Sequence, residues 1–132
     1  METKAILDTS IMVDFIRNRN DAIQKISKLS QEYELCTTDI NIFELYYGAY
    51  ISSQTDKNLA AVKGLSNTLT IFSTSEESME ISAKIMSELK SGGQSIELKD
   101  IFIAGICLCN SCHIVTQNKK HFERTGTKII DI

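Results

Sequence analysis

The stretch AILDTSIMV, residues 5–13, contains the clearest sign of an α/β fold in the sequence. Its aliphatic start, Ala5–Leu7, is typical of a buried strand in a parallel sheet, and Ser10 begins a segment that predicts a helix to about Asn18. Asp8 stands between the two, at the carboxyl end of the predicted strand. Open parallel sheets bind their ligands at that edge. Asp8 is therefore the first candidate functional residue.

The rest of the chain continues this alternation of short apolar runs and amphipathic segments, with no proline and no low-complexity tract. The alternation predicts an α/β fold, a three-layer α/β/α sandwich with a central parallel sheet of four to five strands, in one domain spanning residues 1–132. The predicted strands are 4–8, 34–37, 69–72, 114–116 and 128–130. The predicted helices are 10–18, 21–31, 39–51 with Asp39 as its cap, one around 59–65, one from a Ser73/Glu76 capping box to Gly92, 98–111, and a turn at 118–123.

Size and charge restrict the class of protein. A chain of 132 residues and 14.8 kDa with 42% hydrophobic residues fits a single core. With a net charge of −3, the chain lacks the basic excess that is typical of proteins that hold nucleic acid mainly by counterion release. We find no leader and no apolar run of the roughly 18 to 20 residues that a membrane span needs. The sequence therefore predicts a cytoplasmic protein without a membrane partner.

Two further carboxylates stand in apolar surroundings like those of Asp8. Glu44 is the only charged residue in 40–55, and Asp100 precedes twelve uncharged residues. Burying an ionised carboxylate is costly unless it is paired, hydrogen-bonded or bound to metal. Each has a structural alternative, because Asp8 and Asp100 could interact with helix N-termini and Glu44 could be neutral or pair with a distant arginine. Helix capping leaves Glu44 without a role, so the three together favour a shared metal site.

The cysteines offer a competing metal site. Cys107, Cys109, Cys112 and His113 lie close together, with Cys36 far away in the sequence. Within one helix Cys109 and Cys112 share a face, but Cys107 points elsewhere and no second pair follows at zinc-finger spacing. We therefore favour small side chains packed in a core helix of a protein from a reducing cytosol, rather than zinc ligands or disulfides.

Three acids on rigid elements suit a hard divalent ion, Mg²⁺ or Mn²⁺. Such an ion lowers the pKa of a bound water and stabilises the charge that develops on a phosphodiester. The pattern therefore predicts hydrolysis of a nucleic-acid backbone, with Asp8, Glu44 and Asp100 as the catalytic metal ligands.

Four motifs, in this order and at this spacing, resemble the PIN-domain ribonucleases, and among them the VapC-type toxins of toxin–antitoxin pairs. The motifs are LDTS at 7–10, FELYYG at 43–48, DIFIAG at 100–105 and VTQNKKHFE at 115–123. The similarity covers essentially the whole chain, and the four short motifs are specific only together. It implies a single PIN-like domain that cleaves RNA with Mg²⁺ or Mn²⁺, a small antitoxin that covers the active site, and a homodimer.

The resemblance also implies roles for polar neighbours of the acids. Thr116 and Asn118 would form the polar end of the site, and Thr9 and Ser10 would order the first loop, although Thr116 could equally cap a strand. Many relatives carry a further acid near Asn118 or before the following phenylalanine, where this chain has His121. Glu97, one helical turn before Asp100, could replace that acid or could be an ordinary solvated glutamate.

The basic residues after Thr116 are candidate substrate contacts. Lys119 and Lys120 could hold phosphates, and His121 could assist proton transfer or touch phosphate. The alternative for all three is an ordinary solvated helical turn. Along the predicted helix that carries Glu44, the tyrosines could form an apolar contact surface or belong to the core. They are Tyr46, Tyr47 and Tyr50.

Two other functions compete with the nuclease. A catalytically impaired PIN-fold module would bind an antitoxin or RNA without cleavage, as Asn118 and His121 suggest. Aspartyl-phosphate chemistry at Asp8 fits poorly, because position 10 is serine where a second acid is usual and Lys119 lies three residues beyond Thr116.

Overall fold

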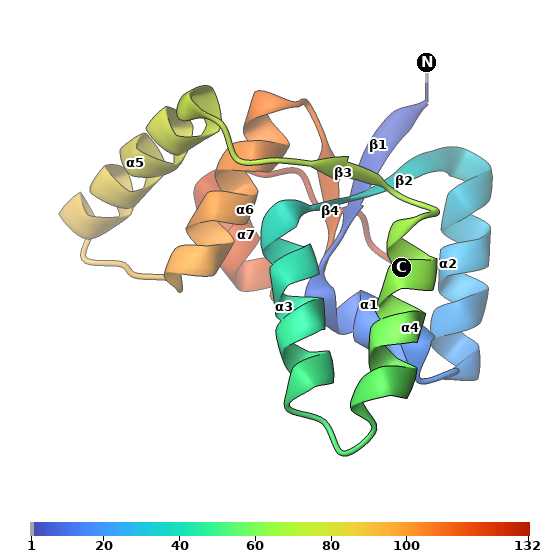
Figure 1. Ribbon diagram of the computed structural model, residues 1–132. Helices are drawn as coiled ribbons and strands as arrows, with labels where there is room; N and C mark the ends of the chain where they lie inside the picture. Colours follow the sequence, from blue (N-terminus) through green and yellow to red (C-terminus); the bar gives the residue numbers. More distant parts are fainter. Residues whose placement is uncertain (1) are drawn as a thin grey trace.

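The computed structural model describes residues 2–132 and centres, within them, on a four-stranded parallel sheet (Figure 1). The strand order is β3-β2-β1-β4. Ile6 of the central strand lies opposite Cys36 on one side and Ile114 on the other. Because the strands are parallel, all of them end at the same edge of the sheet. The strands are β1 (Thr3–Leu7), β2 (Tyr33–Thr38), β3 (Thr70–Phe72) and β4 (His113–Val115).

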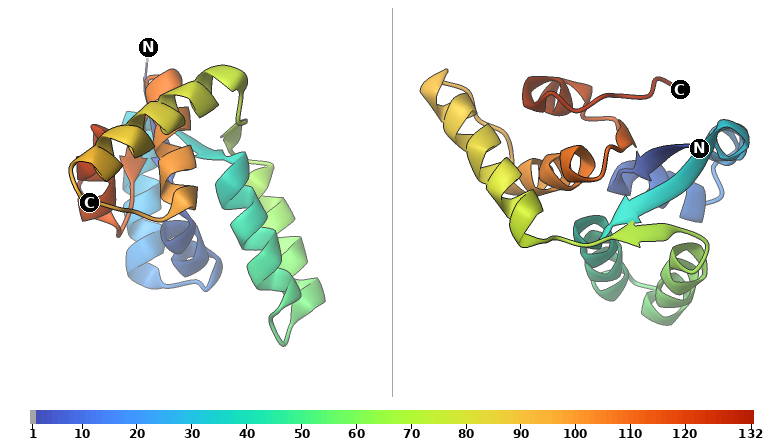
Figure 2. Two further views of the ribbon diagram at one scale, coloured as in Figure 1. Left: turned by 90° about the vertical axis from the view of Figure 1, so that its left-hand side faces the viewer. Right: turned by 90° about the horizontal axis from the view of Figure 1, so that it is seen from above.

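Within residues 2–132, seven helices cover the two faces of this sheet (Figures 1 and 2). One face carries α1 (Thr9–Ile16), α2 (Asn20–Glu32), α3 (Asp39–Tyr50) and α4 (Thr55–Ser66). The other carries α5 (Glu76–Ser91), α6 (Leu98–Cys109) and α7 (Lys119–Thr125). None of the helices of residues 2–132 combines the length and apolar character that crossing a bilayer requires.

The alternation of side chains along β1 separates two hydrophobic cores. Ala5 and Leu7 point into the core beneath α1 to α4, whereas Ile6 points into the core beneath α5 to α7. All three are fully buried. The prediction of a three-layer α/β/α sandwich with a parallel sheet is therefore confirmed.

The predicted strand at 128–130 forms only an isolated parallel bridge between Ile129 and Ile114. The amide of Ile114 donates to the Lys128 carbonyl at 2.9 Å, and that of Ile130 donates to the Ile114 carbonyl at 2.8 Å. The sheet proper therefore has four strands, the lower end of the predicted range.

Two predicted helix caps are wrong. Thr38, not Asp39, caps α3, because its hydroxyl accepts from the Asn41 amide at 3.2 Å. Asp39 instead accepts hydrogen bonds from the amide and hydroxyl of Thr74, which connect the start of α3 to the loop after β3. The α5 capping box uses Ser75 and Ser78, two residues later than predicted: the Ser75 hydroxyl accepts from the Ser78 amide at 3.0 Å, and the Ser78 hydroxyl accepts from the Ser75 amide at 2.9 Å.

The crossing of α5 and α6 depends on Gly105. A Cβ atom at this position would overlap Ser82 Oγ and lie 2.5 Å from the Ser78 carbonyl oxygen. The Ser82 hydroxyl in turn donates to the Ile101 carbonyl at 2.9 Å. The two helices therefore approach closely enough that this position has no room for a side chain.

We expect Gly105→Ala to lower the free energy of unfolding by about 1–3 kcal/mol, because the two helices must separate to admit a methyl group. Urea denaturation measures the loss. Gly64→Ala is the matched control: it lies in α4, and no atom of a neighbouring element comes within 4 Å of the place that its methyl group would take, so we expect it to gain about 0.5–1 kcal/mol. Equal stability of both variants would contradict the close crossing.

Candidate active site

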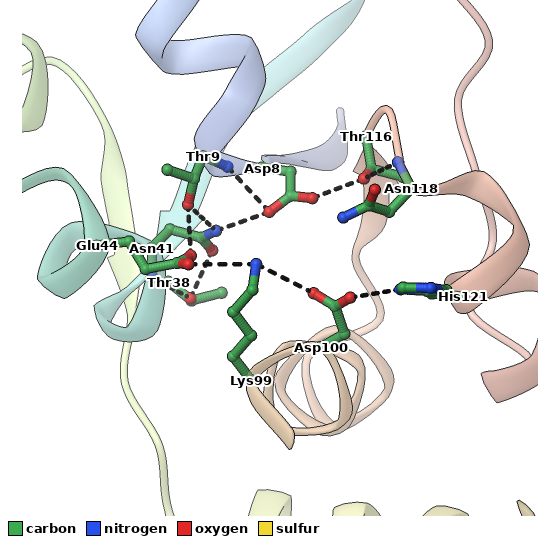
Figure 3. A network of polar contacts seen from close by, with 10 residues as sticks. All are labelled: Asp8, Thr9, Thr38, Asn41, Glu44, Lys99, Asp100, Thr116, Asn118 and His121. Carbon is green, nitrogen blue, oxygen red and sulfur yellow. Dashed lines mark hydrogen bonds and ion pairs between the residues drawn. The ribbon is translucent and has the colours of Figure 1, made fainter. Parts of the chain in front are cut away.

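The carboxyl edge of the sheet gathers polar side chains from three strand ends (Figure 3). Asp8 follows β1 and caps α1, Thr116 follows β4, and Asn41 lies in the first turn of α3, after β2. All three side chains are buried, with at most 4% exposed. Residues distant in the sequence therefore meet where a parallel sheet binds its ligands.

Both oxygens of the Asp8 carboxylate are held in place. Oδ1 accepts hydrogen bonds from the Thr9 amide and from Asn41 Nδ2, each at 2.9 Å. Oδ2 accepts from the Thr116 hydroxyl at 2.6 Å. Asn41 is itself oriented by Thr38, whose hydroxyl donates to Asn41 Oδ1 at 2.7 Å. The orientation of Asp8 is thus fixed from β2, α3 and the end of β4.

Glu44 joins this network through Thr9. The Thr9 hydroxyl donates to Glu44 Oε1 at 2.6 Å and accepts from Asn41 Nδ2 at 3.0 Å. Glu44 lies one turn after Asn41 on α3, so both side chains face the same edge. The mid-helix glutamate that helix capping left unexplained therefore belongs to the Asp8 cluster.

Lys99 connects Glu44 to Asp100. Its Nζ lies 3.2 Å from Glu44 Oε2 and 3.7 Å from Asp100 Oδ1 (Figure 3). Because both oxygens contact one nitrogen, they are at most about 7 Å apart. Lys99 precedes Asp100 in the first turn of α6, so the same helix supplies an acid and a cation to the site.

Asp100 is fully buried at the N-terminus of α6, where the helix dipole favours a negative charge. Its Oδ2 lies 2.8 Å from His121 Nδ1 on α7. Its Oδ1 is buried and has no hydrogen-bond partner among residues 2–132. A buried oxygen without a hydrogen bond is costly, and Lys99 at 3.7 Å offsets this only in part, so the oxygen is a candidate position for a ligand.

The electrostatics of the cluster follow from burial and proximity. Burial raises the pKa of Asp8 above its ordinary value, and the nearby Asp100 charge adds to this, while hydrogen bonds from Thr116 and Thr9 oppose it. For Lys99, burial lowers the pKa, but Asp100, Glu44 and Asp8 outweigh burial and the net pKa is raised. Lys99 therefore carries its charge at neutral pH.

The cluster opens to solvent in a shallow depression of about 400 Å³. Asp8, Glu44 and Lys99 lie on its wall, together with the guanidinium-bearing Arg17. An extended polymer can reach such an open site without passing through a narrow entrance. The remaining lining residues are Thr9, Ser10, Val13, Asp14 and Asn118.

The structure brings together most of the residues that the sequence singled out. Thr9 and Thr116 bind acids directly, His121 contacts Asp100, and Ser10 and Asn118 line the depression. The Asn118 amide also donates to the Thr116 hydroxyl at 2.9 Å, which fixes the loop after β4.

Three other candidates lie outside the cluster. Glu97 is exposed before α6, and its side chain forms no hydrogen bond or ion pair within the described part of the chain. Lys119 pairs with the exposed Asp131 at 2.8 Å. Lys120 is exposed. None of these three side chains forms a hydrogen bond or ion pair with Asp8, Glu44 or Asp100.

Sequence reasoning missed three members of the cluster. Lys99 stands directly before Asp100, and this adjacency was a usable signal that an acid and a cation share a helix turn. Asn41 lies three residues before Glu44, which places both on one helix face. Thr38 was hidden by the expectation that Asp39 caps the helix.

The donor set fits a divalent cation in part. Among residues 2–132, no three His, Cys, Asp or Glu side chains form a ready set of metal ligands, and Glu44 turns one oxygen to Thr9 and the other to Lys99. Asp8 and Asp100 remain, two carboxylates close enough for their charges to interact, one with an oxygen lacking a partner. Carboxylate oxygens are the ligands that Mg²⁺ and Mn²⁺ prefer.

The cysteines are unpaired in this fold. Cys36, Cys107 and Cys112 are buried, and Cys109 is partly exposed. Burial raises the pKa of Cys36 to about 12 and that of Cys112 to about 11, so both are neutral thiols. They pack with aliphatic side chains beneath α5 to α7, as the sequence predicts for core positions.

Comparison with known proteins identifies the family. The PIN domain family model matches residues 5–128. Ribonuclease VapC2 of Haemophilus influenzae is 30% identical over 92% of this chain and 91% of its own length. The tRNA(fMet)-specific endonuclease VapC of Salmonella typhimurium is 30% identical over 97% of each chain.

Solved structures agree with the sequence relatives. DNA-bound VapBC from Salmonella typhimurium contains a chain with a TM-score of 0.86 and 28% identity, covering 99% of this chain and 98% of that one. VapBC-1 from Haemophilus influenzae gives a TM-score of 0.85 and 27% identity, covering 98% of each chain. This chain belongs to the PIN-domain family and, within it, to the VapC group.

We expect Asp8→Asn to unfold at a higher temperature than the wild type at pH 7 in the absence of metal. Burial raises the pKa of Asp8 above 3.8, so the folded chain binds this proton more tightly than the unfolded chain does, and the ionised carboxylate reduces stability. The difference should disappear as the pH falls through the raised pKa towards 3.8. Calorimetry across this pH range measures it.

Asp131→Asn is the control for this measurement, because it removes a carboxylate that is 85% exposed and pairs only at the surface. Its unfolding temperature should stay near that of the wild type throughout. A less stable Asp8→Asn at pH 7 would show that the hydrogen bonds of Asp8 outweigh its burial.

Proposed function

We propose that this chain is a metal-dependent endoribonuclease, the toxin of a toxin–antitoxin pair, which hydrolyses RNA phosphodiester bonds. The observation that carries the proposal is the network of Asp8, Glu44 and Asp100 at the carboxyl edge of the sheet, in a chain of the VapC group. Relatives named as ribonucleases and as tRNA(fMet)-specific endonucleases support it. Transfer RNA is accordingly the first substrate to test.

The cofactor of this reaction is Mg²⁺ or Mn²⁺, held by Asp8 and Asp100. The buried Asp100 Oδ1, which lacks a hydrogen-bond partner, supports this assignment. A bound divalent cation supplies an activated water and neutralises charge that develops on the phosphate. Asn41, Thr9 and Thr116 keep Asp8 in one orientation for this role.

The positively charged side chains that line the depression can contact the substrate. Lys99 and Arg17 line it and can contact backbone phosphates, which position RNA without reading its sequence. With a net charge of −3, the chain holds RNA through these few local contacts rather than through a basic surface. Asn118, exposed on the same wall, offers an amide to the RNA.

A small antitoxin is the protein partner. The solved relatives are described as VapBC and toxin–antitoxin complexes, and Asp8 and Glu44 line an open depression that a segment of the antitoxin would cover. Pairing with an antitoxin and cleavage of RNA both take place in the cytoplasm, a compartment that suits four free cysteines.

We expect Asp100→Asn and excess EDTA each to reduce RNA cleavage by at least about a hundredfold, because even outer partners of a metal ligand contribute 10- to 100-fold. Gel electrophoresis of labelled tRNA measures the rate. Glu97→Gln, one helical turn away, is the matched control and should retain cleavage.

Full cleavage by Asp100→Asn in EDTA would contradict a metal-dependent nuclease. Tight RNA binding without cleavage by the wild type at saturating Mg²⁺ and Mn²⁺ would instead support the impaired binding module.

The proposed function includes a homodimer, and exposed apolar side chains on and just after α3 would form its interface. Phe43, Tyr47, Tyr50 and Ile51 are each at least 58% exposed, and the rings of Phe43 and Tyr47 stack with centroids 6.3 Å apart. Tyr46, by contrast, packs against the core. A row of exposed aromatic side chains is typical of a protein interface.

We expect the wild type to have a mass of about 30 kDa by light scattering, twice the 14.8 kDa of one chain, and the double variant Phe43→Ser/Tyr47→Ser to be monomeric. Removing two aromatic anchors should weaken association by more than about tenfold. Met86→Ser, an exposed apolar residue on α5, is the control and should leave the mass unchanged. A monomeric wild type at high concentration would contradict the dimer.

A further inference from the structure

Most carboxylate oxygens of Asp8, Glu44 and Asp100 already have a hydrogen-bond or ion-pair partner within the chain. Five of their six oxygens have a nitrogen or hydroxyl partner within 3.2 Å, namely Asp8 Oδ1, Asp8 Oδ2, Glu44 Oε1, Glu44 Oε2 and Asp100 Oδ2. The sixth, Asp100 Oδ1, is buried without a hydrogen bond and faces Lys99 Nζ at 3.7 Å. Asp100 Oδ1 is therefore the only oxygen of the three acids that has no hydrogen-bond partner within residues 2–132.

Lys99 occupies the gap between two of the acids. Its ammonium lies between Glu44 and Asp100, and its side chain is 36% exposed, so the charge is partly shielded from water. Three carboxylates and one ammonium leave a formal charge of −2 in the cluster. A divalent ion in the same gap would meet a positive charge at contact distance, where Coulomb repulsion is strong.

The other side of the cluster has neutral donors only. Asp8 accepts hydrogen bonds from Thr9, Asn41 and Thr116. The carboxylates of Asp8 and Asp100 face one another across the cluster (Figure 3), and an opposite charge between them would relieve the repulsion of two negative charges. The cluster therefore has one position suited to an added cation, between Asp8 and Asp100, and one that is filled by lysine.

We propose that Lys99 is a built-in counter-ion that takes the place of a second metal ion, so that the site binds one divalent cation rather than two. The ammonium neutralises Glu44, whose other oxygen accepts from Thr9, while Asp8 and Asp100 would hold the metal ion. This inference deepens the proposed function and depends on its metal site. The charge of Lys99 would thus determine how many divalent cations the site binds.

The test counts metal ions. Mn²⁺ is titrated into the purified full chain and into three variants, with binding followed by calorimetry and by the electron paramagnetic resonance signal of free Mn²⁺. We expect one ion per chain for the wild type and two for Lys99→Met, because the gap between Glu44 and Asp100 then has no positive charge of its own. Lys99→Arg keeps the positive charge and should bind one ion, as should the exposed control Lys120→Met.

A second measurement compares the unfolding temperatures of the wild type and the variants. Without metal, Lys99→Met should unfold at a lower temperature than the wild type, because Glu44 and Asp100 lose their cation while Asp100 stays buried. Mn²⁺ should raise the unfolding temperature of this variant more than that of the wild type. If Lys99→Met does not fold, Lys99→Gln replaces it in both measurements.

Two bound ions in the wild type, or one ion with unchanged affinity in both the wild type and Lys99→Met, would overturn the role of Lys99 and leave the metal-dependent nuclease intact. Absence of Mn²⁺ binding by every variant would contradict the proposed metal site as well. The two failures are thus distinguishable.

Discussion

The burial of the Asp8 carboxylate is the constraint on which the rest of the site depends. An ionised group that is 3% exposed must be matched by donors, and these come from the start of α1, from α3 and from the end of β4. Satisfying one charge therefore fixes the relative positions of three elements at the carboxyl edge of the sheet. Glu44 and Asp100 then join through Thr9 and Lys99.

The fold could be predicted from the sequence because its strongest signals are local. The run Ala5–Leu7 followed by Asp8 specifies a buried strand that ends at the ligand-binding edge, and β1 ends at Leu7 in the structure. The caps of α3 and α5 could not be predicted, since Thr38 and Asp39, or several neighbouring serines, compete for the same role. Tertiary contacts decide between them: Asp39 is drawn to Thr74.

The three acids of the site could be predicted from the sequence, but the contacts that Lys99 and His121 make with them could not. Isolation in apolar sequence marked Asp8, Glu44 and Asp100, whereas nothing local indicates that the Lys99 side chain contacts an acid from α3. His121 lies against Asp100 for a similar reason, because α7 packs beside α6. Both contacts arise from packing between different helices, α6 with α3 and α6 with α7. They turn a cluster of three carboxylates into a partly neutralised one, which limits how the proposed metal ion could bind.

The proposed function requires that Asp8 and Asp100 together hold a divalent cation. An anomalous difference map from crystals of this chain soaked in Mn²⁺ tests it most directly. The expected result is a peak within about 2.5 Å of one oxygen from each of these two carboxylates. A fully soaked crystal with no peak there, or with peaks only elsewhere on the molecule, would contradict the account.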